Sequence, residues 1–174
     1  MTRVDIIALI EKNRPCIEAA MREADLEAYM NTSFKYEIHL LRDGNVETRE
    51  RLASDDWWRS EDQSIYKIAC YCYQYYDPLE ADMDIRHLVR EICKDYNMGR
   101  AERAAYWDWL QSYKEENGEY PDEYERLGWI KKKTSAYESA YRSYVVELVN
   151  ETDYATQLDS IIGDIWSWED MGDE

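Results

Sequence analysis

Four cysteines and one histidine are the residues of this chain best suited to hold a metal. Cys70 and Cys72 are two positions apart, so both face one side of a strand, and with His87 and Cys93 they supply ligand types that zinc prefers. The spacing lacks a second close pair of Cys or His, which zinc sites usually contain. The pattern therefore favours reduced cysteines buried in the core, Cys16 included. We expect no cofactor, and a metal on these residues remains the alternative.

His87 is also the strongest candidate for acid–base chemistry. Asp84 lies three residues before it and Glu91 four residues after it, so all three share one face of a helix and can hold a divalent ion or transfer a proton. The sequence offers no second histidine nearby and no serine in a glycine-rich elbow. We therefore interpret His87 as an exposed helix residue and predict that the protein is not an enzyme. His39, on the polar side of a predicted strand, is a weaker candidate.

The core must rely on aromatic side chains, because aliphatic ones are scarce. Leu, Ile, Val and Phe together number 31 of 174 residues, which at a net charge of −17 would indicate disorder. The 16 Tyr and 7 Trp compensate, since each ring buries about 150–250 Å². We therefore expect residues 1–174 to fold as a single domain.

Charge and hydropathy indicate where the protein works and what it binds. No apolar run approaches the roughly 18–20 residues that span a bilayer, and charged residues interrupt the first 13 positions, so we expect a cytoplasmic protein. Residues 151–174 carry eight carboxylates and no Lys or Arg. A field of this sign repels nucleic acids and acidic membranes, so we expect neither as a direct partner. The predicted partners are positively charged protein surfaces, and the sequence does not indicate an oligomeric state.

The first half of the chain predicts helices followed by a small sheet. Residues 1–33 have helical periodicity interrupted at Pro15. The period then changes to two, and Asp43-Gly44 predicts a two-residue type I′ turn, which requires positive φ at both central positions. With a third run of aromatic and β-branched residues, residues 34–76 predict a three-stranded antiparallel meander.

Residues 82–168 predict helices only. One of them is short, opened by Pro121 and ending near Gly128. The last helix has an apolar stripe that should attach it to the core: Leu158, Ile161, Ile162 and Ile165. The predicted fold class is α+β, with N-terminal helices and the meander followed by a predominantly helical C-terminal half.

One segment suggests contact with nucleic acid. It reads Trp109-Leu110-x-x-Tyr113-x-x-Glu116-x-Gly118-x-x-Pro121, continues with Leu127-Gly128-Trp129-Ile130, and ends in Lys131-Lys132-Lys133. Residues 109–133 resemble the helicase-associated repeat of bacterial and phage proteins, although the basic Gln-Arg pair of that family is missing after the Trp. The resemblance implies a three-helix unit that contacts nucleic acid. The alternative function is therefore a phage or mobile-element DNA-associated accessory protein that uses the basic segment near Trp129; the lysines also suit the negative end of a helix.

The whole profile, short, acidic and rich in Tyr and Trp, resembles phage-encoded anti-CRISPR and anti-restriction proteins. That resemblance implies a stoichiometric inhibitor in a bacterial host cell that presents carboxylates in place of DNA phosphates. The leading prediction is a non-enzymatic acidic protein that occupies the basic nucleic-acid-binding surface of a nuclease such as a CRISPR effector. The partner-binding residues are expected on the last helix and in an acidic, Trp-containing loop: Asp159, Asp164, Glu169, Asp170, Asp55, Asp56, Trp57 and Trp58.

Overall fold

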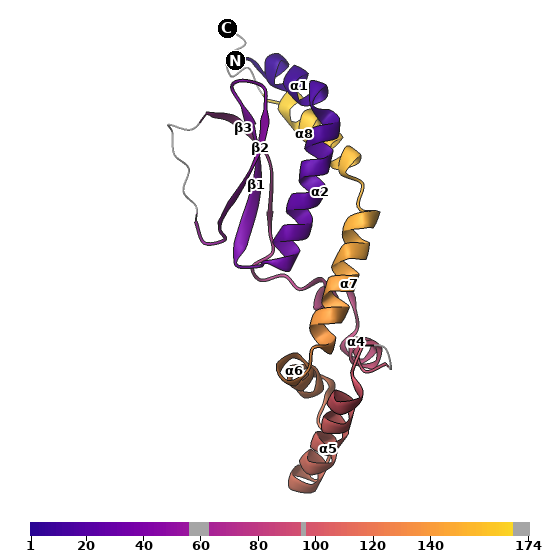
Figure 1. The fold of residues 1–174 in the computed structure, drawn as a ribbon. Coiled ribbons are helices and arrows are strands. Elements are labelled where there is room, and N and C mark those ends of the chain that lie inside the picture. Colours follow the sequence, from indigo (N-terminus) through magenta and orange to yellow (C-terminus); the bar gives the residue numbers. More distant parts are fainter. Residues whose placement is uncertain (56–62, 95–96, 169–174) are drawn as a thin grey trace. The chain divides into compact units, whose positions relative to one another are not determined.

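The computed structural model describes residues 1–55, 63–94 and 97–168, and the chain forms two compact units. The first unit is Met1–Tyr75 with Leu148–Glu174, and the second is Tyr76–Glu147. The first contains α1 (Arg3–Lys12), α2 (Arg14–Met30), β1 (Phe34–Leu41), β2 (Val46–Leu52), β3 (Ser64–Cys72) and α8 (Tyr154–Trp166). The second contains α3 (Pro78–Asp82), α4 (Ile85–Ile92), α5 (Arg100–Asn117), α6 (Glu123–Lys133) and most of α7 (Ala136–Glu151) (Figure 1). The predicted α+β class is confirmed, and a single domain stays a prediction.

The two N-terminal helices follow from local sequence signals. Thr2 and Asp5 form a reciprocal cap, in which the Thr2 hydroxyl accepts from the Asp5 N–H and the Asp5 carboxylate accepts from the Thr2 N–H at 2.9 Å. The predicted interruption at Pro15 is confirmed: α1 ends before Asn13, and Pro15 lies in the first turn of α2, where a missing N–H is harmless. None of the described helices combines the length and apolarity needed to cross a bilayer.

The sheet is antiparallel with the order β2-β1-β3, so the first strand is the central one, whereas a meander would place the second strand there. Strand β1 suits the centre because both of its faces are buried, with Ile38 and Leu40 fully inaccessible. Strand β2, Val46–Leu52, carries four charged residues, Glu47, Arg49, Glu50 and Arg51, and lies at the edge of the sheet.

The turn between β1 and β2 differs from the predicted type I′. Gly44 has φ +87°, but among the residues that the structure describes no non-glycine residue has a positive φ, so Asp43 does not adopt the left-handed region. The Gly44 N–H donates to the Leu41 carbonyl at 2.9 Å, and Asp43 accepts from the Asn45 N–H, a three-residue turn closed by a left-handed glycine. A Cβ on Gly44 would lie 3.2 Å from Leu9, so packing also favours glycine there.

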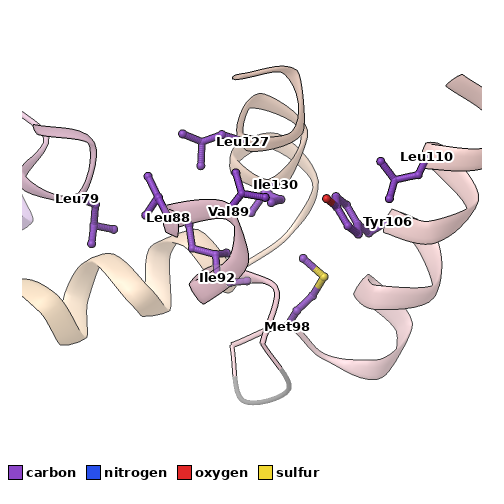
Figure 2. Close-up of a cluster of buried hydrophobic side chains, with 10 residues drawn as sticks. Leu79, Leu88, Val89, Ile92, Met98, Tyr106, Leu110, Leu127 and Ile130 are labelled. Carbon is purple, nitrogen blue, oxygen red and sulfur yellow. The ribbon is translucent and has the colours of Figure 1, made fainter. Parts of the chain in front are cut away.

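The second unit has its own apolar core, shown in Figure 2. Helix α4 contributes Leu88 and Ile92, and α6 contributes Ile130. Helix α6 starts at Glu123, two residues after Pro121, and Asp122 caps it. It runs through Gly128 to Lys133, so the predicted end near Gly128 is wrong. The core members are Leu79, Leu88, Val89, Ile92, Met98, Tyr106, Leu110, Leu127, Ile130 and Ala136.

Helix α8 belongs to the first unit, although the sequence grouped it with the other C-terminal helices. The predicted stripe attaches it: Leu158, Ile162 and Ile165 are buried, and Ile161 is half-buried. It contacts α1 and α2. Long-range packing of this stripe, rather than sequence proximity, decides which unit the helix joins.

A buried carboxylate strengthens this attachment. Asp25 of α2 accepts hydrogen bonds from the hydroxyls of Tyr73 and Tyr154, each at 2.7 Å. Tyr154 opens α8, and Tyr73 follows β3 and stacks on Tyr29 with ring centroids 3.7 Å apart. Asp25 therefore joins α2, the end of the sheet and α8.

Candidate functional site

The predicted partner-binding residues of α8 are only partly available for a partner. Asp159 is two-thirds exposed, but its carboxylate is already ion-paired with Arg14, whose guanidinium also lies 3.5 Å from Glu11. Asp164 is exposed on the same helix. Burial raises the pKa of Tyr66, and the charge of Asp164 makes a smaller contribution in the same direction. Glu169 and Asp170 lie outside the described residues.

The second predicted surface is the acidic loop with two tryptophans. Three of its four residues, Asp56, Trp57 and Trp58, lie outside the described residues. Asp55 is described and exposed. Its carbonyl oxygen accepts a hydrogen bond from the Lys35 ammonium. The contribution of this loop to partner binding stays a prediction.

A denser acidic surface lies at the junction of α5 and α6, which we call the acidic turn and define as residues 115–125. This segment holds no Lys or Arg. Its carboxylates are Glu115, Glu116, Glu119, Asp122, Glu123 and Glu125. Its two tyrosines are exposed, Tyr124 at 72% and Tyr120 at 43% of their surface. Carboxylates with exposed aromatic rings are the side chains expected of a surface that binds a basic protein.

The backbone of the acidic turn is fixed by specific interactions. Gly118 ends α5 with φ +79°, a conformation that glycine adopts without strain. Asp122 then starts α6 by accepting from the Glu125 N–H at 2.8 Å, and Pro121 is buried and accepts through its carbonyl from Arg126. The carboxylates therefore stand on an ordered scaffold.

The negative charge of the acidic turn raises the pKa of a neighbouring tyrosine, Tyr113. Tyr113 donates a hydrogen bond to Glu125, and this bond, with the charges of Glu125, Asp122 and Glu119, raises the pKa of Tyr113 to about 12. Like charges that gather around one hydroxyl make its ionisation unfavourable. A cationic group placed here would be stabilised for the same reason.

Sequence reasoning missed the acidic turn because it averaged charge over long segments. Residues 99–150 carry a net charge of only −2, since eight Lys and Arg, three of them at 131–133, offset ten carboxylates, six of which lie at 115–125. A shorter counting window would have found an eleven-residue run with six acids and no base. The sequence signal was therefore present.

A buried polar chain on the sheet was also missed. His39 is fully buried, not exposed on a polar face; its Nε2–H donates to Glu37 Oε1 at 3.1 Å, and its Nδ1 accepts from the Ser64 hydroxyl at 2.7 Å. Burial lowers the pKa of His39. Burial alone would raise the pKa of Glu37, but the hydrogen bond from His39 and the charges of Lys67 and Arg51 outweigh it and lower this pKa.

This Ser–His–carboxylate chain contains groups that can transfer protons, but its geometry is that of a structural network. Ser64, His39 and Glu37 are each less than a tenth exposed, and each satisfies a polar group of its neighbour. We therefore infer that these three residues stabilise the sheet.

The predicted metal and acid–base residues do not form one cluster. Cys70 and Cys72 belong to the first unit and His87 and Cys93 to the second, and within the described residues no three His, Cys, Asp or Glu side chains are arranged around a metal-sized position. The expectation of buried cysteines is wrong for Cys16, Cys70 and Cys72, which are exposed, because α2 and β3 turn these positions outward. Cys93 is half-buried.

His87 lies on α4 as predicted. Its side chain is 59% exposed, and Nε2 is 3.9 Å from Glu91. Asp84, the third member of the predicted face, caps α4 by accepting from the Arg86 and His87 N–H groups. The interpretation of His87 as an exposed helix residue is confirmed.

The basic run near Trp129 is partly neutralised within the second unit. Lys131 hydrogen-bonds Glu80 and lies 3.8 Å from Asp77. The indole of Trp129 stacks on Trp109 with ring centroids 5.3 Å apart and packs against the core. Lys132 and Lys133 are exposed in the last turn of α6, where they suit the negative end of the helix.

Comparison with known proteins adds no assignment. No protein-family model matches the chain, and neither the curated proteins nor the solved structures contain a match. The resemblances to the helicase-associated repeat and to acidic phage inhibitors therefore stay predictions.

Proposed function

We propose that the protein is a non-enzymatic acidic binding protein that occupies the basic nucleic-acid-binding surface of a nuclease, with a CRISPR effector as the leading target class. The observation that carries the proposal is the acidic turn, where six carboxylates and two exposed tyrosines stand on an ordered junction of α5 and α6. The net charge of −17 supports it. In this proposal the protein acts in the cytoplasm of a bacterial host cell.

The physical basis is competition between carboxylates and phosphates for the same cations. Side chains three positions apart at the start of a helix, such as Asp122 and Glu125, stand about 5–6 Å apart, on the scale of phosphate spacing along a strand. A groove that binds phosphates through Lys and Arg can bind carboxylates through the same charge-assisted hydrogen bonds. Because the turn is ordered before binding, little conformational entropy is lost on association.

Neutralising the acidic turn is expected to weaken binding to the target at least tenfold. The variant is Glu115→Gln, Glu116→Gln and Glu119→Gln, which leaves the capping Asp122 and the hydrogen-bonded Glu125 intact. The readout is competition with guide or target nucleic acid on a panel of purified CRISPR effector nucleases, at low and physiological salt, where electrostatic binding must weaken as salt rises.

One charge-matched control and one variant of the α8 surface locate the binding surface. Glu23→Gln, Glu27→Gln and Glu151→Gln remove the same charge from exposed positions of the first unit and should leave affinity within about twofold. A quadruple variant tests the surface of α8 that the sequence predicts: Asp159→Asn, Asp164→Asn, Glu169→Gln and Asp170→Asn. If the target binds that surface, the affinity of this variant falls at least tenfold. Equal effects of the two triple variants, or salt-independent binding, would contradict a site at the acidic turn.

The isolated protein is expected not to bind duplex DNA measurably near physiological salt. Its lysine run can neutralise few phosphates, Lys131 is already paired with carboxylates, and the net field is repulsive. Fluorescence anisotropy with labelled duplex is the measurement. Micromolar binding that disappears in the variant Lys131→Ala, Lys132→Ala and Lys133→Ala would favour the DNA-associated accessory function instead.

A further inference from the structure

A groove of about 370 Å³ lies on the second unit between α4 and α7, separate from the acidic turn. Its volume is within the range of sites that bind small molecules, about 300–1,000 Å³. Leu88 and Ile92 of α4, drawn in Figure 2, form the floor with Ala140 of α7. The floor is apolar and continuous with the core of the unit.

The rim of the groove is acidic. Glu91 of α4 and Glu147 of α7 both line it. Tyr144 lines it as well and donates its hydroxyl proton to Asp82 at 3.2 Å. Burial and the charges of Asp82 and Glu147 raise the pKa of Tyr144. Glu91 lies 2.5 Å from the ammonium of Lys94, next to the groove, and 3.9 Å from His87 Nε2. Glu147 is exposed to solvent and can pair with a ligand.

We propose that this groove binds the side chain of an arginine supplied by the basic partner. The proposal rests on the proposed function, since it names the residue type through which that partner would be anchored. The three methylenes of arginine lie along an apolar floor, while its planar guanidinium donates two parallel hydrogen bonds to a carboxylate such as Glu147. A purely apolar occupant would desolvate the rim carboxylates without pairing them, and an anion would be repelled.

Arginine is favoured over lysine by the geometry of the rim. Tyr144 lies four positions after Ala140, and Glu147 lies four positions after Ser143 and three after Tyr144, so all four residues share one side of α7. A carboxylate, a phenol and an aromatic ring therefore border one end of the groove. A guanidinium is weakly hydrated and can contact the carboxylate and the aromatic ring at the same time, whereas an ammonium is compact and more strongly hydrated.

The test is an NMR titration of the full chain with N-acetyl-arginine amide at physiological salt, with the neutral citrulline analogue as the matched probe. Saturable shifts are expected at the amides of Leu88, Ile92, Ala140 and Ser143, with at least fivefold weaker binding of citrulline. Shifts spread evenly over the acidic surface, or equal binding of both probes, would overturn the proposal.

Two variants with matched controls test the same groove. Ser143→Phe fills it from an exposed position and should abolish the saturable shifts, whereas Val146→Phe, on an exposed position of α7 outside the groove, should not. Glu147→Gln should weaken arginine binding at least fivefold, and Glu138→Gln, also on α7 but outside the groove, should leave it unchanged. Retained binding in both groove variants would overturn the proposal.

The same variants separate this proposal from the proposed function. If a target nuclease binds the protein and Ser143→Phe does not alter that affinity, the groove proposal fails while the proposed function stands. If arginine amide binds the groove but none of the nuclease panel binds the protein, the proposed function fails while the groove remains a guanidinium site.

Discussion

Replacing Asp25 by alanine is expected to lower the free energy of unfolding by about 2–5 kcal/mol. The hydroxyls of Tyr73 and Tyr154 would each lose an acceptor at 2.7 Å, and a buried donor left without a partner costs about 1–3 kcal/mol. A domain of this size is stable by only about 5–15 kcal/mol. The first unit would therefore lose a large share of its stability, and α8 would lose a buried polar attachment.

Urea unfolding followed by circular dichroism measures this effect as a shift of the midpoint at constant slope. Glu23→Ala, at an exposed position of the same helix, should change stability by less than about 0.5 kcal/mol. The triple variant Asp25→Leu, Tyr73→Phe and Tyr154→Phe should recover much of the loss, because donors and acceptor are removed together. A loss below 1 kcal/mol in Asp25→Ala would show that the network is not important for stability.

Local signals predicted most helices and the strands of the sheet. Pro15 marks the start of α2, Gly118 ends α5, and Asp84 caps α4, each through interactions within four residues. The alternation over residues 34–40 predicts a strand with Phe34, Tyr36, Ile38 and Leu40 on one face. In β1 the last three are buried and Phe34, at the start of the strand, is half-buried. These features depend on backbone geometry that neighbouring residues determine.

Features set by distant partners were not predictable in the same way. Asp25 is bonded by tyrosines 48 and 129 positions away, and nothing in its neighbours distinguishes it from the exposed acids of α2. Likewise β3 pairs with β1 instead of β2, because a long connection allows the chain to reach the other edge. His39 has a period-two position that suggests exposure, but Ser64 and Glu37 enclose it.

Stability is expected to fall steeply above pH 10. Burial raises the pKa of Tyr71 and Tyr154, and for Tyr154 the hydrogen bond to Asp25 adds to this. In the unfolded chain these phenols lose their protons near pH 10, whereas in the folded protein they keep them. The folded state then binds more protons than the unfolded state, so stability is fully present below pH 10 and is lost as the pH rises toward the folded pKa values.

The expected slope is about 1.4 kcal/mol per pH unit for each such tyrosine, or about 3 kcal/mol per unit for Tyr71 and Tyr154 together. In the core of the second unit, burial raises the pKa of Tyr106 to about 12, which contributes with the same sign. Urea unfolding at pH 9, 11 and 12 measures the slope, which is close to zero at pH 9 and reaches its full value only above about pH 11. Because Tyr154→Phe removes one titrating group, the pH profile of this variant should be shallower by about 1.4 kcal/mol per unit. If stability did not depend on pH over this range, these hydroxyls would ionise as freely in the folded protein as in the unfolded chain.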